Sequence, residues 1–322
     1  MTETAHGAIE NSSSPNPFVF AVGCARSGTT LLTRMLDAHP RIAMTPETHW
    51  IPKFYEEGPG VTPGQLRRLG DYHRIRKLGL SSADLESLID PDGQTPYARF
   101  GSRFFDLYAS RAGKPLAGDK TPSYVRVIPF LNRLWPKARF IHLIRDGRDV
   151  VLSALKWEKN AKNVGKFSTW ADEPILTAAL WWAWNVDCGR AAGRALVPEL
   201  YHEISYEELV ADPERGCRDI AAFLGIEFDD AMLRFHEGRT RDEGGRSAKK
   251  AWLPPTPGLR DWRTQMSPDD TELFEAAAGD LLATLGYERR FPAHCAAARA
   301  RAERVRERFD LETRIVDSRP KA

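Results

Sequence analysis

The sequence predicts an α/β fold of three layers, in which helices flank both faces of a parallel sheet. Three passages from strand to helix support this prediction. FVFAVG (18–23) precedes a helical pattern, ARFIHLIR (138–145) runs directly into one, and LYHEI (200–204) is followed by another. Strands that alternate with helices along a chain form parallel sheets that are covered on both faces.

The first passage combines a strand, a glycine-bearing turn and a helix. Its apolar strand ends at Gly23, and apolar side chains then recur at helical spacing until Pro40 (Leu31, Leu32, Met35 and Leu36). RIAM (41–44) predicts a second strand, which ends at Thr45 and Pro46.

Residues 55–94 are rich in glycine, proline and charge, which predicts an irregular insertion with short helices. A helix over about 96–112 follows, with Thr95 as its N-cap.

Further helices are predicted in the second half of the chain. Asp146 is placed to cap the helix after the strand at 138–145, and an aromatic-rich helix follows at 175–195. Ser205 and Glu208 have the S-x-x-E spacing of a capping box. The last helix carries one narrow apolar stripe, which predicts a surface or oligomer-contact helix (Ala298, Ala302, Val305 and Phe309).

Composition excludes several classes of protein. The 322 residues include 46 Lys and Arg against 44 Asp and Glu, whereas a dedicated nucleic-acid binder has a strong basic excess. No apolar run reaches membrane-spanning length, so we expect no membrane segment. Residues 1–16 are polar and lack the layout of a signal peptide, which predicts a disordered tail.

The four cysteines are far apart and show no metal-type pairing. This predicts reduced thiols and a cytoplasmic protein (Cys24, Cys188, Cys217 and Cys295).

The segment GCARSGTTLL (23–32) has the glycine spacing of a phosphate-binding P-loop, G-x-x-x-x-G-K-[ST]. Gly23 and Gly28 fill the glycine positions and Thr30 the hydroxyl position, but Thr29 replaces the lysine. A strand that enters a helix through such a turn points backbone N–H groups and the helix dipole at an anion. The loop therefore predicts a 5′-phosphoryl site that is poorly equipped for a triphosphate with its metal; a mere strand–helix turn is the alternative.

A second anion site is predicted at IRDGRDVVLSAL (144–155). Arg145 ends a strand, and Ser153 lies two turns into the helix that follows. Positions 146, 149 and 153 share one helical face, so Arg145 and Ser153 could grip one anionic group near the helix start. Pairing of Arg145 with a neighbouring carboxylate is the alternative.

Together, RSGTTLL (26–32) and RDGRDVVLSAL (145–155) resemble the donor-binding motifs of the sulfotransferase superfamily, whose members use 3′-phosphoadenosine 5′-phosphosulfate (PAPS) and need no metal. The resemblance implies a sulfotransferase fold with two anion sites in place of a triphosphate site. It implies that the 5′-phosphosulfate contacts one set of residues (Arg26, Ser27, Gly28, Thr29 and Thr30) and that the 3′-phosphate contacts another (Arg145 and Ser153).

Three further segments lie where such enzymes have comparable sequences: GDKTPSYV (118–125), ISYEELVADP (204–213) and LRDWRTQMSP (259–268). Within the superfamily, RSGTTLLTRMLDAHPRIAMTPETHWIP (26–52) looks closest to the protein-tyrosine sulfotransferases and related bacterial enzymes.

The resemblance implies a sulfotransferase domain over 17–290. Within it, 55–115 would be a substrate-side insertion and 157–175 a lid over the acceptor site. Residues 291–322 would form a C-terminal helical tail.

The same resemblance implies that Glu47 is the general base, because the related enzymes carry a glutamate in the loop after the second strand. A carboxylate within hydrogen-bond reach can take the proton from an attacking hydroxyl. The carboxyl ends of neighbouring parallel strands meet at one rim, which brings this loop beside Arg26. His49 is the rival base.

Lys120 matches the lysine that family members aim at the bridging oxygen of the donor, where a fixed cation stabilises the transition state. Arg26 would share this task. Tyr206 corresponds to a tyrosine that contacts adenine, and Ser247 falls near a serine that touches the phosphosulfate. A further basic residue for the 3′-phosphate is left open among four (Lys249, Lys250, Arg260 and Arg263).

The predicted function is transfer of a sulfuryl group from PAPS to an acceptor hydroxyl by in-line displacement. A P-loop kinase or nucleotide triphosphatase, and a catalytically inactive PAP-binding module, are the alternatives. The expected partners are a small-molecule or peptide hydroxyl acceptor and, in a homodimer, a second copy of the chain. Nucleic acid and membrane are not expected partners.

Overall fold

A computed structural model of the chain gives the positions of most residues. It describes residues 17–58, 60–157, 160–237, 254–256, 258 and 260–318. The tail predicted at 1–16 lies outside the described residues.

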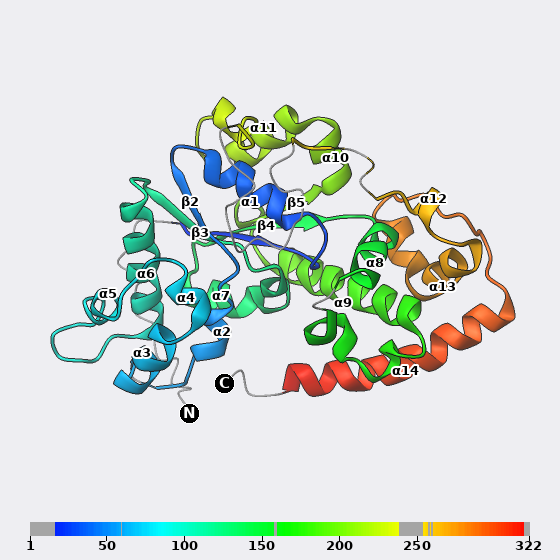
Figure 1. Cartoon of the computed structure of the whole chain (residues 1–322), viewed down its shortest axis with the longest axis horizontal. Coiled ribbons are helices and arrows are strands. Elements are labelled where there is room, and N and C mark those ends of the chain that lie inside the picture. Colours follow the sequence, from blue (N-terminus) through cyan, green and yellow to red (C-terminus); the bar gives the residue numbers. More distant parts are fainter. Residues whose placement is uncertain are drawn as a thin grey trace, which may run out of the picture.

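Five parallel strands form one sheet in the order β2–β3–β1–β4–β5. The strands are β1 (Val19–Val22), β2 (Ile42–Thr45), β3 (Leu116–Asp119), β4 (Arg139–Ile144) and β5 (Tyr201–Ser205). Helices lie on both faces of this sheet (Figure 1), which confirms the predicted α/β fold.

The two faces of the sheet are covered by different helices because the side chains of a strand alternate. Val19 and Ala21 of β1 join a core with α1 (Thr29–Ala38), α10 (Tyr206–Ala211) and α11 (Pro213–Phe223). Phe20 and Val22 point to the opposite face. There they join a core with α6 (Tyr97–Arg111) and α7 (Ile128–Leu134).

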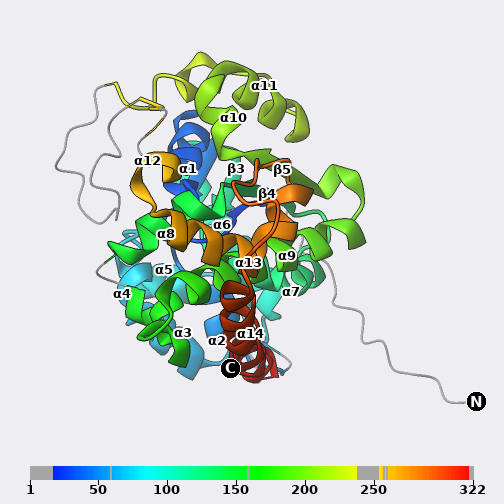
Figure 2. The same cartoon turned by 90° about the vertical axis from the view of Figure 1, so that its right-hand side faces the viewer.

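A third core lies beyond the carboxyl ends of β1 and β4, on the right-hand side in Figure 1 and toward the viewer in Figure 2. It is built by α8 (Gly147–Leu155), α9 (Pro174–Ala195), α13 (Pro268–Thr284) and α14 (Ala296–Ser318). The short helix α12 (Trp262–Gln265) joins this group through the buried Trp262 ring.

The apolar stripe of α14 lies in this third core. Ala298, Ala302, Val305 and Phe309 are buried within the chain, and the Phe309 ring stacks on Phe167 with 4.3 Å between centroids. As predicted, α14 is a surface helix, because most of its described side chains are exposed, but α9, α13 and residues 164–170 cover its apolar stripe, so an oligomer contact does not account for the stripe. A homodimer stays a prediction.

Residues 55–94 contain short helices, as predicted. They are α3 (Pro63–Gly70), α4 (His73–Arg76) and α5 (Ser82–Glu86), and they follow α2 (Trp50–Phe54). Thr62 and Ser81 begin α3 and α5 with capping boxes. Apolar residues of these helices extend the core beneath α6.

The N-cap predicted for α6 is wrong by one residue. Pro96 occupies that position, and the Thr95 hydroxyl instead accepts a hydrogen bond from the Asp90 amide at 2.6 Å. The caps predicted for two other helices are present. Asp146 accepts from the Arg148 amide and Ser205 from the Glu208 amide.

Within the described residues, no helix combines the length and apolar character that crossing a bilayer demands.

Candidate active site

The loop between β1 and α1 is pressed tightly against its neighbours. Gly28 has a φ of 97°, and a Cβ atom added there would lie 2.4 Å from the Tyr206 ring. A Cβ atom on Gly23 would lie 2.5 Å from the Leu143 carbonyl oxygen. Both predicted glycine positions thus require glycine. At Gly28 the reasons are the lack of space for a side chain and the left-handed backbone conformation together.

The same loop presents donors at the start of α1. Gly28 is the N-cap residue and supplies no side chain to the first amides of the helix, which Thr29 and Thr30 begin. The Ser27 hydroxyl is buried and has no hydrogen-bond partner among the described residues. Such uncapped amides and an unsatisfied hydroxyl suit an anionic group.

The two predicted anion motifs meet in space. Arg26 Nε donates to Ser153 Oγ at 3.0 Å, although the two residues are 127 positions apart. The Arg145 guanidinium lies over the Tyr206 ring, 4.2 Å from its centroid, and that ring packs on Gly28. The loop of β1, the end of β4 and the start of α10 therefore share one rim of the sheet.

Arg26 occupies a strained and cationic position. Its φ is 78°, a left-handed conformation that few residues other than glycine adopt. Burial lowers the pKa of its guanidinium, Glu47 raises it, and Arg260 and Arg145 lower it further. Positive charges thus gather at this rim, as binding of a multiply charged anion demands.

Glu47 and Lys120 face each other across neighbouring strand ends. Glu47 lies two residues after β2, and Lys120 directly follows β3. Lys120 Nζ donates to Glu47 Oε1 at 3.0 Å; the Lys120 side chain is 8% exposed and the Glu47 side chain 33%. Burial alone would raise the pKa of Glu47, but the nearby His49 side chain and the hydrogen-bonded Lys120 ammonium lower it to about 2. Glu47 is therefore an anion at neutral pH.

Two further basic side chains surround Glu47. His49 Nε2 lies 3.8 Å from Glu47 Oε2, and its Nδ1 lies 3.3 Å from Ser123 Oγ. Arg74 of α4 donates to the Glu47 carbonyl oxygen at 2.7 Å and lies 3.7 Å from the carboxylate. No motif in the sequence pointed to Arg74, because this residue reaches the site from within the irregular insertion.

A cavity of about 550 Å³ lies beside Arg145 and Tyr206. Of the four basic candidates for the 3′-phosphate, Arg260 and Arg263 line it. Arg263 forms an exposed ion pair with Glu288, whereas Arg260 is close enough to Arg26 to affect its pKa. This geometry favours Arg260 over Arg263. Ser247, Lys249 and Lys250 lie outside the described residues.

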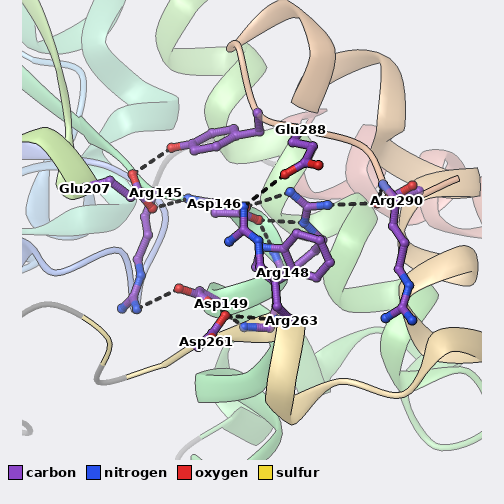
Figure 3. A network of polar contacts seen from close by, with 12 residues as sticks. Arg145, Asp146, Arg148, Asp149, Glu207, Asp261, Arg263, Glu288 and Arg290 are labelled. Atoms are coloured by element: carbon purple, nitrogen blue, oxygen red, sulfur yellow. Dashed lines mark hydrogen bonds and ion pairs between the residues drawn. The ribbon is translucent and has the colours of Figure 1, made fainter. Parts of the chain in front are cut away.

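Figure 3 shows a network of polar contacts, of which Arg145, Asp146 and Asp149 line this cavity. Arg148 is fully buried, donates to Asp146 and Glu275, and lies over the Trp262 ring at 3.6 Å. Figure 3 shows Arg145 pointing to Asp149, whose Oδ2 accepts from Arg145 Nη2 at 3.1 Å. Arg145 thus pairs with a neighbouring carboxylate, which was the alternative to anion binding. The Nε atom of Arg145 is nevertheless buried and has no hydrogen-bond partner among the described residues.

Among the residues with described positions, no group of three or more His, Cys, Asp or Glu side chains is arranged to hold a metal ion.

The chain is similar to known enzymes over most of its length. A family model described as "Sulfotransferase family" matches residues 17–230. Protein-tyrosine sulfotransferase 1 of Danio rerio is 27% identical over 289 residues, which cover 84% of this chain and 72% of that protein. The Homo sapiens protein of the same name is 28% identical over 281 residues, 84% of this chain and 70% of that protein. The chain spans only 52% of the Drosophila melanogaster protein-tyrosine sulfotransferase.

Solved structures have the same fold. The sulfotransferase domain of the Synechococcus PCC 7002 olefin synthase superposes with a TM-score of 0.61 at 27% identity, covering 85% of this chain and 96% of that domain. The sulfotransferase domain of the curacin biosynthetic pathway gives a TM-score of 0.58 at 21% identity, over 85% of this chain and 99% of that domain. Since the family model matches more than half of the chain, and both motifs that predicted the family lie on one rim of the sheet, the chain belongs to the sulfotransferase family and is an enzyme of the PAPS-dependent class.

Proposed function

We propose that this enzyme moves a sulfuryl group from PAPS to an acceptor hydroxyl by in-line displacement, with Glu47 as the general base. One observation supports this proposal most strongly. The Glu47 carboxylate and the Lys120 ammonium are 3.0 Å apart, at the rim where the Arg26 loop meets Ser153. A base, a buried cation and an anion-binding loop thus lie together.

The residues of this rim fit PAPS, which supplies the sulfuryl group when it is bound. The buried Ser27 hydroxyl and Arg145 Nε have no partner among the described residues and are suited to phosphoryl oxygens. Loop amides from Gly28 to Thr30 would hold the 5′-phosphosulfate. The 3′-phosphate would be held by Arg145, Ser153 and Arg260. Tyr206, which lines the cavity, would contact the adenine.

The chemistry of the step follows from the charges around Glu47. Its carboxylate takes the proton of the acceptor hydroxyl, while Lys120 and Arg26 stabilise negative charge on the leaving oxygen. The hydrogen bond from Lys120 helps to keep the pKa of Glu47 near 2, which makes the carboxylate a weak base. When the Lys120 charge is shared with an anion, its effect on Glu47 decreases and the carboxylate becomes a stronger base.

The acceptor is proposed to be a peptide or small-molecule hydroxyl. The names of the curated relatives support a tyrosine hydroxyl. Residues 55–115 supply Arg74 to the surroundings of Glu47, and Trp157 lies 5.3 Å from the Arg26 guanidinium. We therefore propose that 55–115 and 157–175 shape the acceptor site, as loops beside a rigid sheet commonly do.

Donor binding is tested by thermal unfolding with PAP and, separately, with ATP and Mg²⁺. A ligand at one hundred times its Kd stabilises the fold by about 2.7 kcal/mol, so PAP should raise the Tm clearly and ATP with Mg²⁺ should not. A shift with ATP and Mg²⁺ alone, together with ATP turnover, would favour the kinase alternative.

Transfer is tested with sulfur-35-labelled PAPS and a panel of tyrosine peptides, phenols, sugars and alkyl alcohols. We expect labelled product with the wild type and none with Glu47→Gln, which should bind PAP with unchanged affinity. His49→Gln is the matched control and should retain most of the transfer. Loss with His49→Gln but not with Glu47→Gln would identify His49 as the base, and PAP binding without any transfer would favour the inactive module.

A further inference from the structure

We propose that Asp119 is a positioning residue that fixes the Glu47 loop to the strand end carrying Lys120, so that base and cation act as one unit. This inference rests on the proposed role of Glu47. Asp119 ends β3, is 0% exposed and directly precedes Lys120 in the chain. It lies too deep to touch an acceptor, so it acts through its neighbours.

The Asp119 carboxylate binds both ends of the short segment that carries Glu47. Its Oδ2 atom accepts a hydrogen bond from Thr45 Oγ1 at 2.8 Å and from Thr48 Oγ1 at 2.5 Å. Glu47 stands between these two threonines. The loop is therefore anchored on each side of the base by one buried oxygen atom.

The two residues after Asp119 add to this contact. The Lys120 amide donates to the Thr45 carbonyl oxygen at 3.3 Å, and Lys120 Nζ reaches Glu47. Thr121 Oγ1 accepts from the amides of Thr48, at 3.2 Å, and His49, at 3.4 Å. Three consecutive residues, 119–121, thus hold the whole segment from 45 to 49. We call this set of contacts the base clamp.

Burial of the Asp119 carboxylate costs free energy, because the charged group loses its contact with water. Burial raises the pKa of Asp119, and the hydroxyls of Thr48, Thr121 and Thr45 lower it in compensation. Hydrogen bonds to a charged acceptor are stronger and shorter than neutral ones, so they define the loop position more narrowly.

The backbone after Glu47 needs such an anchor. His49 has a φ of 55°, in the left-handed region where a residue other than glycine is strained. Its amide is held by Thr121, so the base clamp stabilises the turn that sends the chain into α2. Without it, relaxation of this turn would move Glu47 away from Lys120.

The expected consequence of losing the clamp is a loss of rate rather than of donor affinity. A displacement of about 1 Å in a reacting group can cost about 100-fold in rate. The donor-binding loop, residues 23–30, has its own contacts with β4 and α10 and is not bound by Asp119.

The inference is tested with Asp119→Ala, Asp119→Asn and Thr48→Val. Asp119→Ala should lower kcat about 100-fold while the Kd for PAP changes less than about threefold. Asp119→Asn retains an oxygen acceptor for both threonines and should restore most of the rate. Thr48→Val keeps the buried carboxylate and should lower kcat about tenfold, which tests the clamp even where Asp119→Ala does not fold.

Two controls separate positioning from a general structural role. Thr271→Val removes another buried hydroxyl, which donates to the Ser267 carbonyl at 2.8 Å in α13, and should leave kcat unchanged. In the Glu47→Gln background, where transfer is absent but PAP binding is kept, Asp119→Ala should change the Kd for PAP by less than about threefold, because Asp119 acts only through Glu47. A wild-type kcat in both Asp119→Ala and Thr48→Val, or an equal loss of PAP affinity in either, would overturn the inference.

Hydrogen exchange tests the clamp without an acceptor. In Asp119→Ala and Thr48→Val, the amides of Thr48 and His49 should exchange at least about tenfold faster, while peptides over 23–32 are unchanged. Unchanged exchange at 48–49 contradicts the clamp. Absence of transfer by the wild type, with this acceleration present, would instead count against the proposed function alone.

Discussion

At the scale of single residues, burial and close partners set the charge of each group at the donor side of the site. Asp149 is the clearest case. Its Oδ1 accepts from the Trp262 amide at 2.9 Å and its Oδ2 from Arg145. Burial raises the pKa of Asp149 to about 6, the charge of Arg145 lowers it, and the nearby Asp146 raises it. The side chain therefore takes up its proton near pH 6.

This shift predicts a pH dependence of stability. An unfolded aspartate titrates near pH 4, so the folded state binds the Asp149 proton more tightly and gains stability below about pH 4 that is lost as the pH rises through about 6. Relative to Asp149→Asn, the wild type should lose on the order of 2 kcal/mol of unfolding free energy between pH 4 and pH 7. Urea unfolding at both pH values measures this, and a pH-independent difference would contradict it.

At the scale of elements, the turn from β1 into α1 works because glycine lets three elements approach one another. The Gly28 backbone packs against the Tyr206 ring of α10. The guanidinium of Arg145, which follows β4, lies over the same ring. Contact between backbone and ring aligns the loop amides with the second anion motif.

Gly28→Ala should therefore weaken donor binding. The added methyl group must displace Tyr206 and also strains a φ of 97°. We expect the affinity for PAP to fall by at least about tenfold, together with a loss of about 1–2 kcal/mol of stability from the backbone. Gly113→Ala is the matched control, since Gly113 has a φ of 68° but no atom within 4 Å of the added carbon. Calorimetric titration with PAP that gives equal affinities for both variants would contradict the packing argument.

At the scale of the whole molecule, segments far apart in the sequence stabilise one another around the rim. The third core joins α8 and α9 to α13 and α14, and the C-terminal helix lies along residues 164–170. Figure 2 shows α14 and α13 beside α9. The segment predicted to be a lid is therefore attached to α14 through Phe167, which stacks on Phe309, and its role as a lid stays a prediction.

Phe309→Ala tests this packing. Removal of a buried phenylalanine ring that stacks on Phe167 should cost about 3–5 kcal/mol of unfolding free energy. Leu311→Ala, two residues away, should change stability by less than about 0.5 kcal/mol because Leu311 is 60% exposed. Denaturant unfolding of the two variants gives the comparison; equal losses would mean that α14 does not pack as described.

Local features could be predicted well from the sequence. The turn at Gly23–Gly28 and the caps at Asp146 and Ser205 involve residues at most five positions apart in the chain. Residues so close in sequence are also close in space, so a sequence motif is enough to predict these features. β3 gave no comparable pattern. Its Gly118 is required because a Cβ atom there would lie 2.5 Å from the Val19 carbonyl oxygen of β1, a contact between strands that no local spacing reveals.

By itself, the sequence determined the fold class and the family, because apolar periodicity and short motifs act within a few positions of the chain. Only the tertiary structure decided that Glu47 pairs with Lys120, that Arg260 lies close to Arg26, and that the α14 stripe is buried. Each of these depends on contacts between segments far apart along the chain. Such contacts arise from the packing of helices and strands in three dimensions, which residue spacing does not encode.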